Sequence, residues 1–170
     1  MELVTDTCVL SSLHKGGVLR EAFLLSGELI APDVIELELE GPNSHVPDWQ
    51  GLITLGLRVY ELPGEHVAIV EGMAKRYAKP SRVDLFALVL AQQRSAILLT
   101  DDVDLRKAAS KEGVRTQGTI WLLDQMIHQG VLDYPKAQMA LRAMSEKGTQ
   151  LSQQEIARFI QRWKDPKSKP

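Results

Sequence analysis

The chain has 170 residues, of which 44% are hydrophobic and 25% are charged, and its formal net charge is −2. This length and composition predict one soluble globular domain that is large enough to bury a sizeable core. The single cysteine, Cys8, excludes an intramolecular disulfide, and the lack of a signal peptide or an apolar run of about 20 residues predicts a cytoplasmic protein with no membrane partner.

Short apolar runs alternate with helical patterns along the whole chain. Strands are predicted over residues 3–6, 28–32, 57–63, 96–100 and 114–118. Helices are predicted over residues 17–25, 32–41, 64–78, 81–94, 102–112, 119–130, 136–147 and 152–163. This alternation predicts an α/β fold in which helices cover both faces of a parallel sheet of about five strands.

The segment 32–41 has an ambiguous pattern. It alternates glutamate with apolar side chains, as a strand would, but Pro32 and Asp33 are typical of a helix start, so we predict a helix. On such a helix Glu36 and Glu38 cannot both face one site, because positions two apart point about 200° apart. The following residues, 41–51, are the best candidate for a loop.

Acidic residues gather where the predicted strands end. Asp6 closes the first strand, and Asp101 and Asp102 follow the fourth. Asp84 lies in the first turn of the helix that leads into the fourth strand, and Glu38 follows the second strand. Ligands of doubly wound sheets bind beyond the carboxyl ends of the strands, so we expect these side chains to share one edge of the sheet.

A cluster of carboxylates has a specific chemical meaning. Neighbouring carboxylates raise one another's pKa, and a divalent cation relieves their repulsion. Oxygen ligands without His or Cys select Mg²⁺ or Mn²⁺, and such ions support phosphodiester hydrolysis. The alternative is a structural role for each acid, with Asp84 and Asp101 as helix caps and Glu38 as a solvated surface residue.

Five segments in chain order resemble the motifs of PIN-domain nucleases. They are VTDTCVL (4–10), APDVIELEL (31–39), SRVDLFALVLA (81–91), LLTDDVDLRKAA (98–109) and GVRTQGTIWLLDQMIHQGVL (113–132). The register of these motifs selects Glu38 in the second and Asp102 in the fourth. The stretch KGTQLSQQEIARFI (147–160) resembles the C-terminal extension of a PIN subgroup close to the VapC toxins.

The resemblance implies a fold, an activity and partners. The expected fold is a three-layer α/β/α PIN-like domain over residues 1–132, with a helical extension over residues 133–170 that packs on the same domain and has a flexible end. The expected activity is that of a Mg²⁺- or Mn²⁺-dependent endoribonuclease, and the expected role is that of the toxin in a VapBC-type toxin–antitoxin pair. RNA is then the substrate, and an antitoxin protein is an expected partner.

The resemblance also implies the roles of particular residues. The expected catalytic residues are Asp6, Glu38, Asp84 and Asp102. Three of them, Asp6, Asp84 and Asp102, are the expected metal ligands, and Thr7 and Thr100 would orient a carboxylate or a water. The chain departs from the family pattern at Cys8, which replaces a small polar residue, and at Asp84, where the VapC-like subgroup often has Glu after Gly.

Charge is divided unevenly along the chain. Residues 1–74 carry 12 acidic and 3 basic residues, a net charge of −9, whereas residues 75–170 carry a net charge of +7. A basic half suits a phosphate-rich ligand, because phosphate contacts set affinity and register. The candidates for such contacts are Arg106, which is the best single one, Arg82, and the nearby Lys75, Arg76, Lys79 and Lys107.

The two last predicted helices carry apolar stripes. The stripes are Ala137, Ala140, Leu141 and Met144 on one helix, and Ile156, Phe159, Ile160 and Trp163 on the other. Most such stripes face the core of their own domain. The alternative is an interface for a homodimer or for an antitoxin.

Two other function classes compete with the nuclease hypothesis. One is a non-catalytic PIN-like module that binds nucleic acid or a protein, in which the acids have lost metal binding. The other is a receiver-like signalling domain, where paired acids also bind Mg²⁺. The receiver hypothesis is weaker, because a receiver has its acid pair after the first strand, whereas Asp101 and Asp102 follow the fourth.

Overall fold

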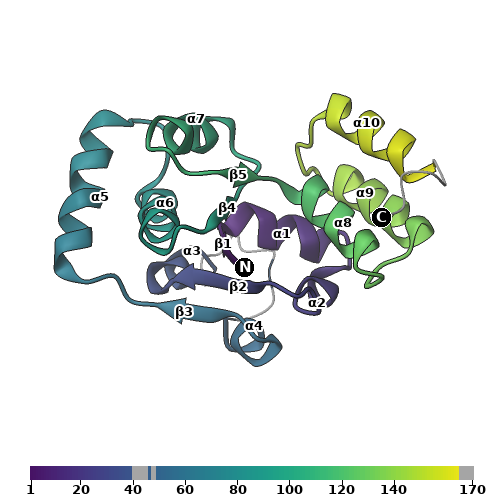
Figure 1. The fold of residues 1–170 in the computed structure, drawn as a ribbon, viewed down its shortest axis with the longest axis horizontal. Coiled ribbons are helices and arrows are strands. Elements are labelled where there is room, and N and C mark those ends of the chain that lie inside the picture. Colours follow the sequence, from purple (N-terminus) through teal and green to yellow (C-terminus); the bar gives the residue numbers. More distant parts are fainter. Residues whose placement is uncertain (40–45, 47–48, 165–170) are drawn as a thin grey trace.

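A sheet of five parallel strands forms the centre of the computed structural model, which describes residues 1–39, 46 and 49–164 (Figure 1). The strands are β1 (Glu2–Thr5), β2 (Glu28–Pro32), β3 (Arg58–Tyr60), β4 (Ile97–Leu99) and β5 (Thr116–Gln117). They lie in the order β3-β2-β1-β4-β5. The five predicted strands are therefore confirmed, with bounds that differ by a few residues.

Strand order reverses beside β1. The chain runs outward from β1 to β2 and β3, and then returns to the other side of β1 with β4 and β5. Val4 of β1 pairs with Ile30 of β2 on one side and with Leu98 of β4 on the other. The carboxyl ends of β1 and β4 flank this switch point, which is where doubly wound sheets bind their ligands.

Helices cover both faces of the sheet, so the fold is the predicted three-layer α/β/α arrangement (Figure 1). One face carries α1 (Thr7–Lys15), α2 (Leu19–Ala22), α8 (Thr119–His128) and α9 (Tyr134–Glu146). The other face carries α5 (Gly64–Arg76), α6 (Arg82–Arg94) and α7 (Val103–Lys111). The remaining helices are η1 (Asp33–Ile35), α3 (Glu36–Leu39), α4 (Trp49–Leu55) and α10 (Gln153–Lys164).

The side chains of the strands divide between two apolar cores. Leu3 and Leu99 belong to the core that includes α1 and α8, whereas their neighbours Val4 and Leu98 belong to the core that includes α6 and α7. All four side chains are buried. Because both faces of the sheet are covered, the central strand β4 is apolar on both faces, as its sequence predicted.

The sequence patterns do not predict α1. Its residues include Thr, Cys and Ser, which are weak helix formers. The helix depends instead on Asp6, whose side chain caps its N-terminus, and on Val9, Leu10 and Leu13, which are buried on one face. A cap and tertiary packing thus decide a segment whose local propensity is low.

Two further predictions need correction. The helix predicted over residues 17–25 is limited to α2, because the chain must turn into β2 at Glu28. The loop predicted over residues 41–51 lies mostly outside the described residues, and its last part belongs to α4, which begins at Trp49. Trp49 is buried in the core, so packing selects the helix there.

The two C-terminal helices pack on the core. The predicted stripe of α9 is buried, which agrees with the core interpretation. On α10, Phe159 is buried, and the Trp163 Nε1 donates a hydrogen bond of 2.8 Å to the Asp124 carboxylate of α8. Within the described ranges, no helix has the length and the apolar character that crossing a membrane requires.

Candidate active site

Four helices begin at the carboxyl edge of the sheet, and an acidic side chain caps each of them. Asp6 accepts a hydrogen bond from the Val9 backbone N–H at the start of α1, at 2.9 Å. Asp102 accepts one from the Leu105 N–H at the start of α7, at 2.6 Å. Asp84 caps α6 together with Ser81, and Asp101 caps α8. The sequence therefore brings these acids together through helix capping.

Asp6 lies deepest in the cluster. Its residue is only 3% exposed, and the Cys8 thiol donates to both of its carboxylate oxygens, at 3.1 and 3.0 Å. Burial raises the pKa of Asp6 to about 7, although hydrogen bonds from Cys8, Thr100 and Val9 lower it. The negative charge of Asp84 raises the pKa further. Asp6 is thus a buried carboxyl group whose ionisation the protein disfavours.

Glu38 faces the same edge of the sheet from α3. The Thr7 hydroxyl donates to Glu38 Oε2 at 2.5 Å, and the Ser81 hydroxyl donates to Glu38 Oε1 at 3.1 Å. Residues 33–39 are helical, as predicted, so Glu36 points elsewhere while Glu38 contacts Thr7 and Ser81. The contact of Ser81 with Glu38 was not predicted, because the sequence indicates Ser81 only as a helix cap.

Asp84 connects Glu38 with the remaining acids. Its carboxylate accepts from the Ser81 backbone N–H at 2.8 Å, and the Ser81 hydroxyl accepts from the Asp84 N–H at 3.1 Å, which completes a capping box. Burial raises the pKa of Asp84, and the negative charges of Glu38 and Asp102 raise it further. Glu38, Asp84 and Asp102 therefore lie close enough together for their charges to repel one another.

Thr100 connects β4 with Asp102. Its hydroxyl accepts a hydrogen bond from the Asp102 backbone N–H at 3.1 Å, and it lies 4.0 Å from the Cys8 sulfur. Thr100 also lowers the pKa of Asp6 through a hydrogen bond. The two predicted supporting residues therefore each contact one of the predicted catalytic acids or its backbone, Thr7 at Glu38 and Thr100 at Asp6 and Asp102.

Asp101 has a structural role that its sequence neighbourhood does not reveal. It caps α8 rather than α7, because the Thr119 backbone N–H donates to its Oδ1 at 3.0 Å. It also pairs with Arg106 at 3.5 Å. Gly118 permits this arrangement, since a Cβ there would collide with both Arg106 and Asp101. The Gly-Thr pair at the start of the predicted helix was the signal for this cap.

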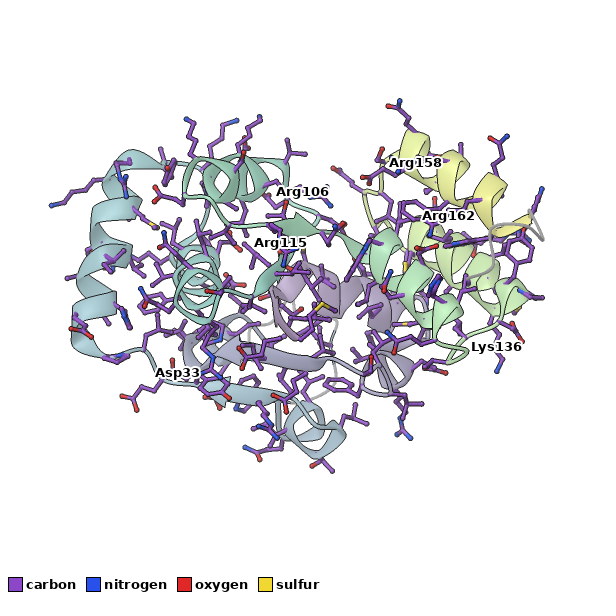
Figure 2. The ribbon with its side chains drawn as sticks, viewed as in Figure 1. Asp33, Arg106, Arg115, Lys136, Arg158 and Arg162 are labelled. Atoms are coloured by element: carbon purple, nitrogen blue, oxygen red, sulfur yellow. The ribbon has the colours of Figure 1, made fainter. Side chains whose placement is uncertain are left out.

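The two arginines predicted to contact nucleic acid have partners within the protein. Arg106 lies between α7 and α10 (Figure 2), where its Nε donates to the Thr100 carbonyl at 2.8 Å and its guanidinium reaches Glu155 at 3.9 Å. Arg82 pairs with Glu71 on α5, and 66% of the Arg82 side chain is exposed. Arg106 therefore links Thr100 and Asp101 to Glu155 of α10, whereas Arg82 remains on the surface.

The donor set of Asp6, Glu38, Asp84 and Asp102 fits a hard divalent ion. The four side chains offer only oxygen, and within the described part of the chain none of them forms an ion pair with Lys, Arg or His. Over the same residues, no three Asp, Glu, His or Cys side chains stand close enough to hold one ion as they lie. A shared ion thus requires at least some of these side chains to move closer together than they lie in this structure.

Comparisons with known proteins agree with this fold. The family model DUF3368, described as a PIN domain, matches residues 2–165. No curated protein matches the sequence. Among solved structures, a PilT N-terminus domain protein from the hyperthermophilic archaeon Sulfolobus solfataricus P2 is similar, with a TM-score of 0.54 and 15% identity over 75% of this chain and 94% of that chain. At this identity the likeness shows a shared fold.

Replacing Asp6 with Asn should stabilise the metal-free protein at alkaline pH. The folded chain holds the Asp6 proton more tightly than the unfolded chain, because its pKa of about 7 lies above the ordinary 3.8. The free energy of unfolding therefore falls as the pH rises from 4 through 7, by at most about 4 kcal/mol. Asn still caps α1 and carries no charge. Melting curves in EDTA at pH 5 and pH 8 measure the effect, and an equal pH dependence in both proteins would contradict it.

Replacing Gly118 with Ala should destabilise the protein by about 0.5–2 kcal/mol, because the new methyl group displaces the ends of the Asp101 and Arg106 side chains and weakens the cap that Asp101 forms on α8. Gly72 on α5 is the matched control, since a Cβ there meets nothing within 4 Å. Gly72→Ala should stabilise the protein by roughly 0.5–1 kcal/mol. Urea unfolding measures both changes, and equal effects of the two substitutions would show that Gly118 is not needed for this contact.

Proposed function

The chain belongs to the PIN-domain family, whose members are generally nucleases, and we propose that it is a Mg²⁺- or Mn²⁺-dependent endoribonuclease. One observation carries the proposal. Four carboxylates without cationic partners among the described residues lie around the switch point of the sheet, and burial and mutual repulsion raise the pKa of two of them, Asp6 and Asp84. A divalent ion would offset that repulsion.

The proposed roles follow from the contacts of each side chain. Asp6, Asp84 and Asp102 would hold the ion, which supplies a water of lowered pKa and charge neutralisation at the phosphate. Glu38 is held by Thr7 and Ser81 in an orientation that faces the same edge, so it would accept a hydrogen bond from the attacking water. Cys8 and Thr100 orient Asp6 and the Asp102 backbone.

The basic surface near this edge supports binding of a nucleic-acid backbone. Lys79, Arg82 and Lys107 are exposed, and each forms an ion pair with a nearby acid. Exposed ion pairs of this kind contribute only about 0–1 kcal/mol to the stability of the folded chain. Phosphate groups of RNA can therefore compete with the acids for these cations. Arg82 lies two residues before Asp84, at the start of the same helix, and is the best placed of them. Arg106 would support the site from within.

We further propose that the chain is the toxin of a VapBC-type pair and acts in the cytoplasm. The support is the resemblance of residues 147–160 to the extension of VapC-like members, which the structure describes as the segment before α10 and most of that helix. A second protein, the antitoxin, would then block the site, and a second copy of the chain is the alternative partner. In the absence of the antitoxin, RNA would reach both the basic surface and the acidic site.

A non-catalytic nucleic-acid-binding module is the competing function. The observation that favours it is that each of the three aspartates is engaged at a helix N-terminus, and that the described residues hold no ready-made metal site. Metal binding separates the two functions, because a module of this kind would bind Mn²⁺ weakly or not at all.

Asp6→Asn and Asp102→Asn should each reduce Mn²⁺-dependent cleavage of a labelled RNA by roughly 10²–10⁴-fold, because each removes a charge that holds the ion. Asp104→Asn is the matched control: Asp104 lies on α7 beside Asp102 but pairs with Lys79 and Lys107 instead. Its turnover at saturating RNA should stay within twofold of the wild type, because the change frees Lys79 and Lys107 and so affects only the affinity for RNA. Cleavage in EDTA, or full activity of Asp6→Asn, would refute the metal-dependent nuclease, and calorimetry with Mn²⁺ tests the binding step directly.

Induced expression of the chain alone should arrest bacterial growth if it is a toxin, because free ribonuclease would degrade cellular RNA. Expression of Asp6→Asn to the same level should leave growth unchanged. A small antitoxin-like reading frame, where one is found upstream of the gene, should restore growth when it is co-expressed with the wild type. If the wild type cleaves RNA in vitro but its expression leaves growth normal, the nuclease function stands and the toxin role is rejected.

A further inference from the structure

A polar cleft adjoins the acid cluster on the side of the C-terminal helices. It has a volume of about 620 Å³ and lies between the start of α7 and the segment that leads into α10. Asp102 belongs both to this cleft and to the proposed catalytic cluster. A volume of this size lies in the range of small-molecule sites. An RNA strand with its phosphate at Asp102 would therefore have its next nucleotide in the cleft.

The charges around the cleft favour a neutral group over a phosphate. Three carboxylates line it, those of Asp101, Asp102 and Glu155. The cation among its lining residues is Arg106, whose guanidinium is already bonded to the Thr100 carbonyl, Asp101 and Glu155. A phosphate entering the cleft would meet net negative charge, whereas a base with an amino group would meet acceptors.

Two glutamine amides are available to bind such a base. Gln150 and Gln154 line the cleft and are exposed, and within the described residues neither amide forms a hydrogen bond. Val103, of which 62% is exposed, and Leu151 add apolar surface against which a flat ring can lie. An amide offers a donor and an acceptor side by side, and this pair matches the edge of adenine.

We infer that this cleft binds a nucleobase next to the cleaved phosphodiester, preferably adenine, and that Gln150 and Gln154 read its edge. The inference rests on the proposed nuclease function and adds the substrate feature that the enzyme selects. Glu155 accepts from the exocyclic amino group, while Val103 and Leu151 contact the ring. The C-terminal helices thereby contribute a specificity determinant to a site whose proposed catalytic acids all come from residues 6–102.

Cleavage of a randomised RNA pool tests the inference in the presence of Mn²⁺. The wild type should prefer adenine at one position beside the cut by about tenfold over the other bases, and the double variant Gln150→Ala/Gln154→Ala should lose that preference. Gln153→Ala is the matched control, because Gln153 is the neighbouring exposed glutamine but lines the groove between α9 and α10 instead. Its preference for adenine should persist. Cleavage without a base preference, or with one that the double variant keeps, would overturn the inference and leave the nuclease function standing.

A binding measurement separates this inference from the proposed function. Fluorescence anisotropy with the Asp6→Asn variant, whose substitution lies outside the cleft, compares a labelled five-nucleotide RNA that contains one adenine with the same RNA abasic at that position. The adenine RNA should bind about tenfold more tightly, and Gln150→Ala/Gln154→Ala in the same background should make the two equal. Equal binding of both RNAs before that change would overturn the inference whether or not RNA is cleaved. Failure of the wild type to cleave RNA, with the adenine-dependent binding intact, would instead reject the nuclease alone.

Discussion

The helix N-termini that converge on one edge of the sheet are the constraint on which the site depends. In a parallel sheet the covering helices run antiparallel to the strands, so α1, α6, α7 and α8 all begin at the carboxyl edge of the sheet. Each start exposes backbone N–H groups that need acceptors. Asp6, Asp84, Asp102 and Asp101 supply them. The acidic character of this edge is therefore a consequence of the topology as much as of the chemistry.

Helix capping and the proposed metal binding would use the same carboxylates in different ways. The positive ends of the helices offset part of the repulsion among the acids, and this makes the cluster tolerable in the folded chain. Asp6 is the exception, because burial outweighs its hydrogen bonds and leaves ionisation unfavourable. The cluster therefore retains an unfavourable electrostatic energy that a protein optimised only for stability would remove. In the proposed function, a bound divalent cation would lower this energy.

The sequence allowed much of the fold to be predicted, and the parts it missed have physical reasons. The strands and the acids at their ends follow from local apolar runs and from residue order. Helix α1 was missed because its weak helix formers are stabilised by a cap and by burial rather than by propensity. The role of Asp101 was missed because its partner, Thr119, lies 18 residues further along the chain. Glu38 was selected over Glu36 by the register of the second motif, whereas its contacts with Thr7 and Ser81 could not be predicted, because both partners are distant in the sequence.

Arg106 has a consequence for how chains of this kind can diverge. Its guanidinium contacts the end of β4, the cap of α8 and the first turn of α10, and Gly118 leaves the space that it occupies. Loss of Arg106 or of Asp101 leaves the other without this charged partner, and a larger residue at Gly118 collides with both side chains. Compatible changes at Asp101, Arg106 and Gly118 must therefore arise together, so lineages of this fold are expected to exchange the whole group as a unit rather than to vary it one residue at a time.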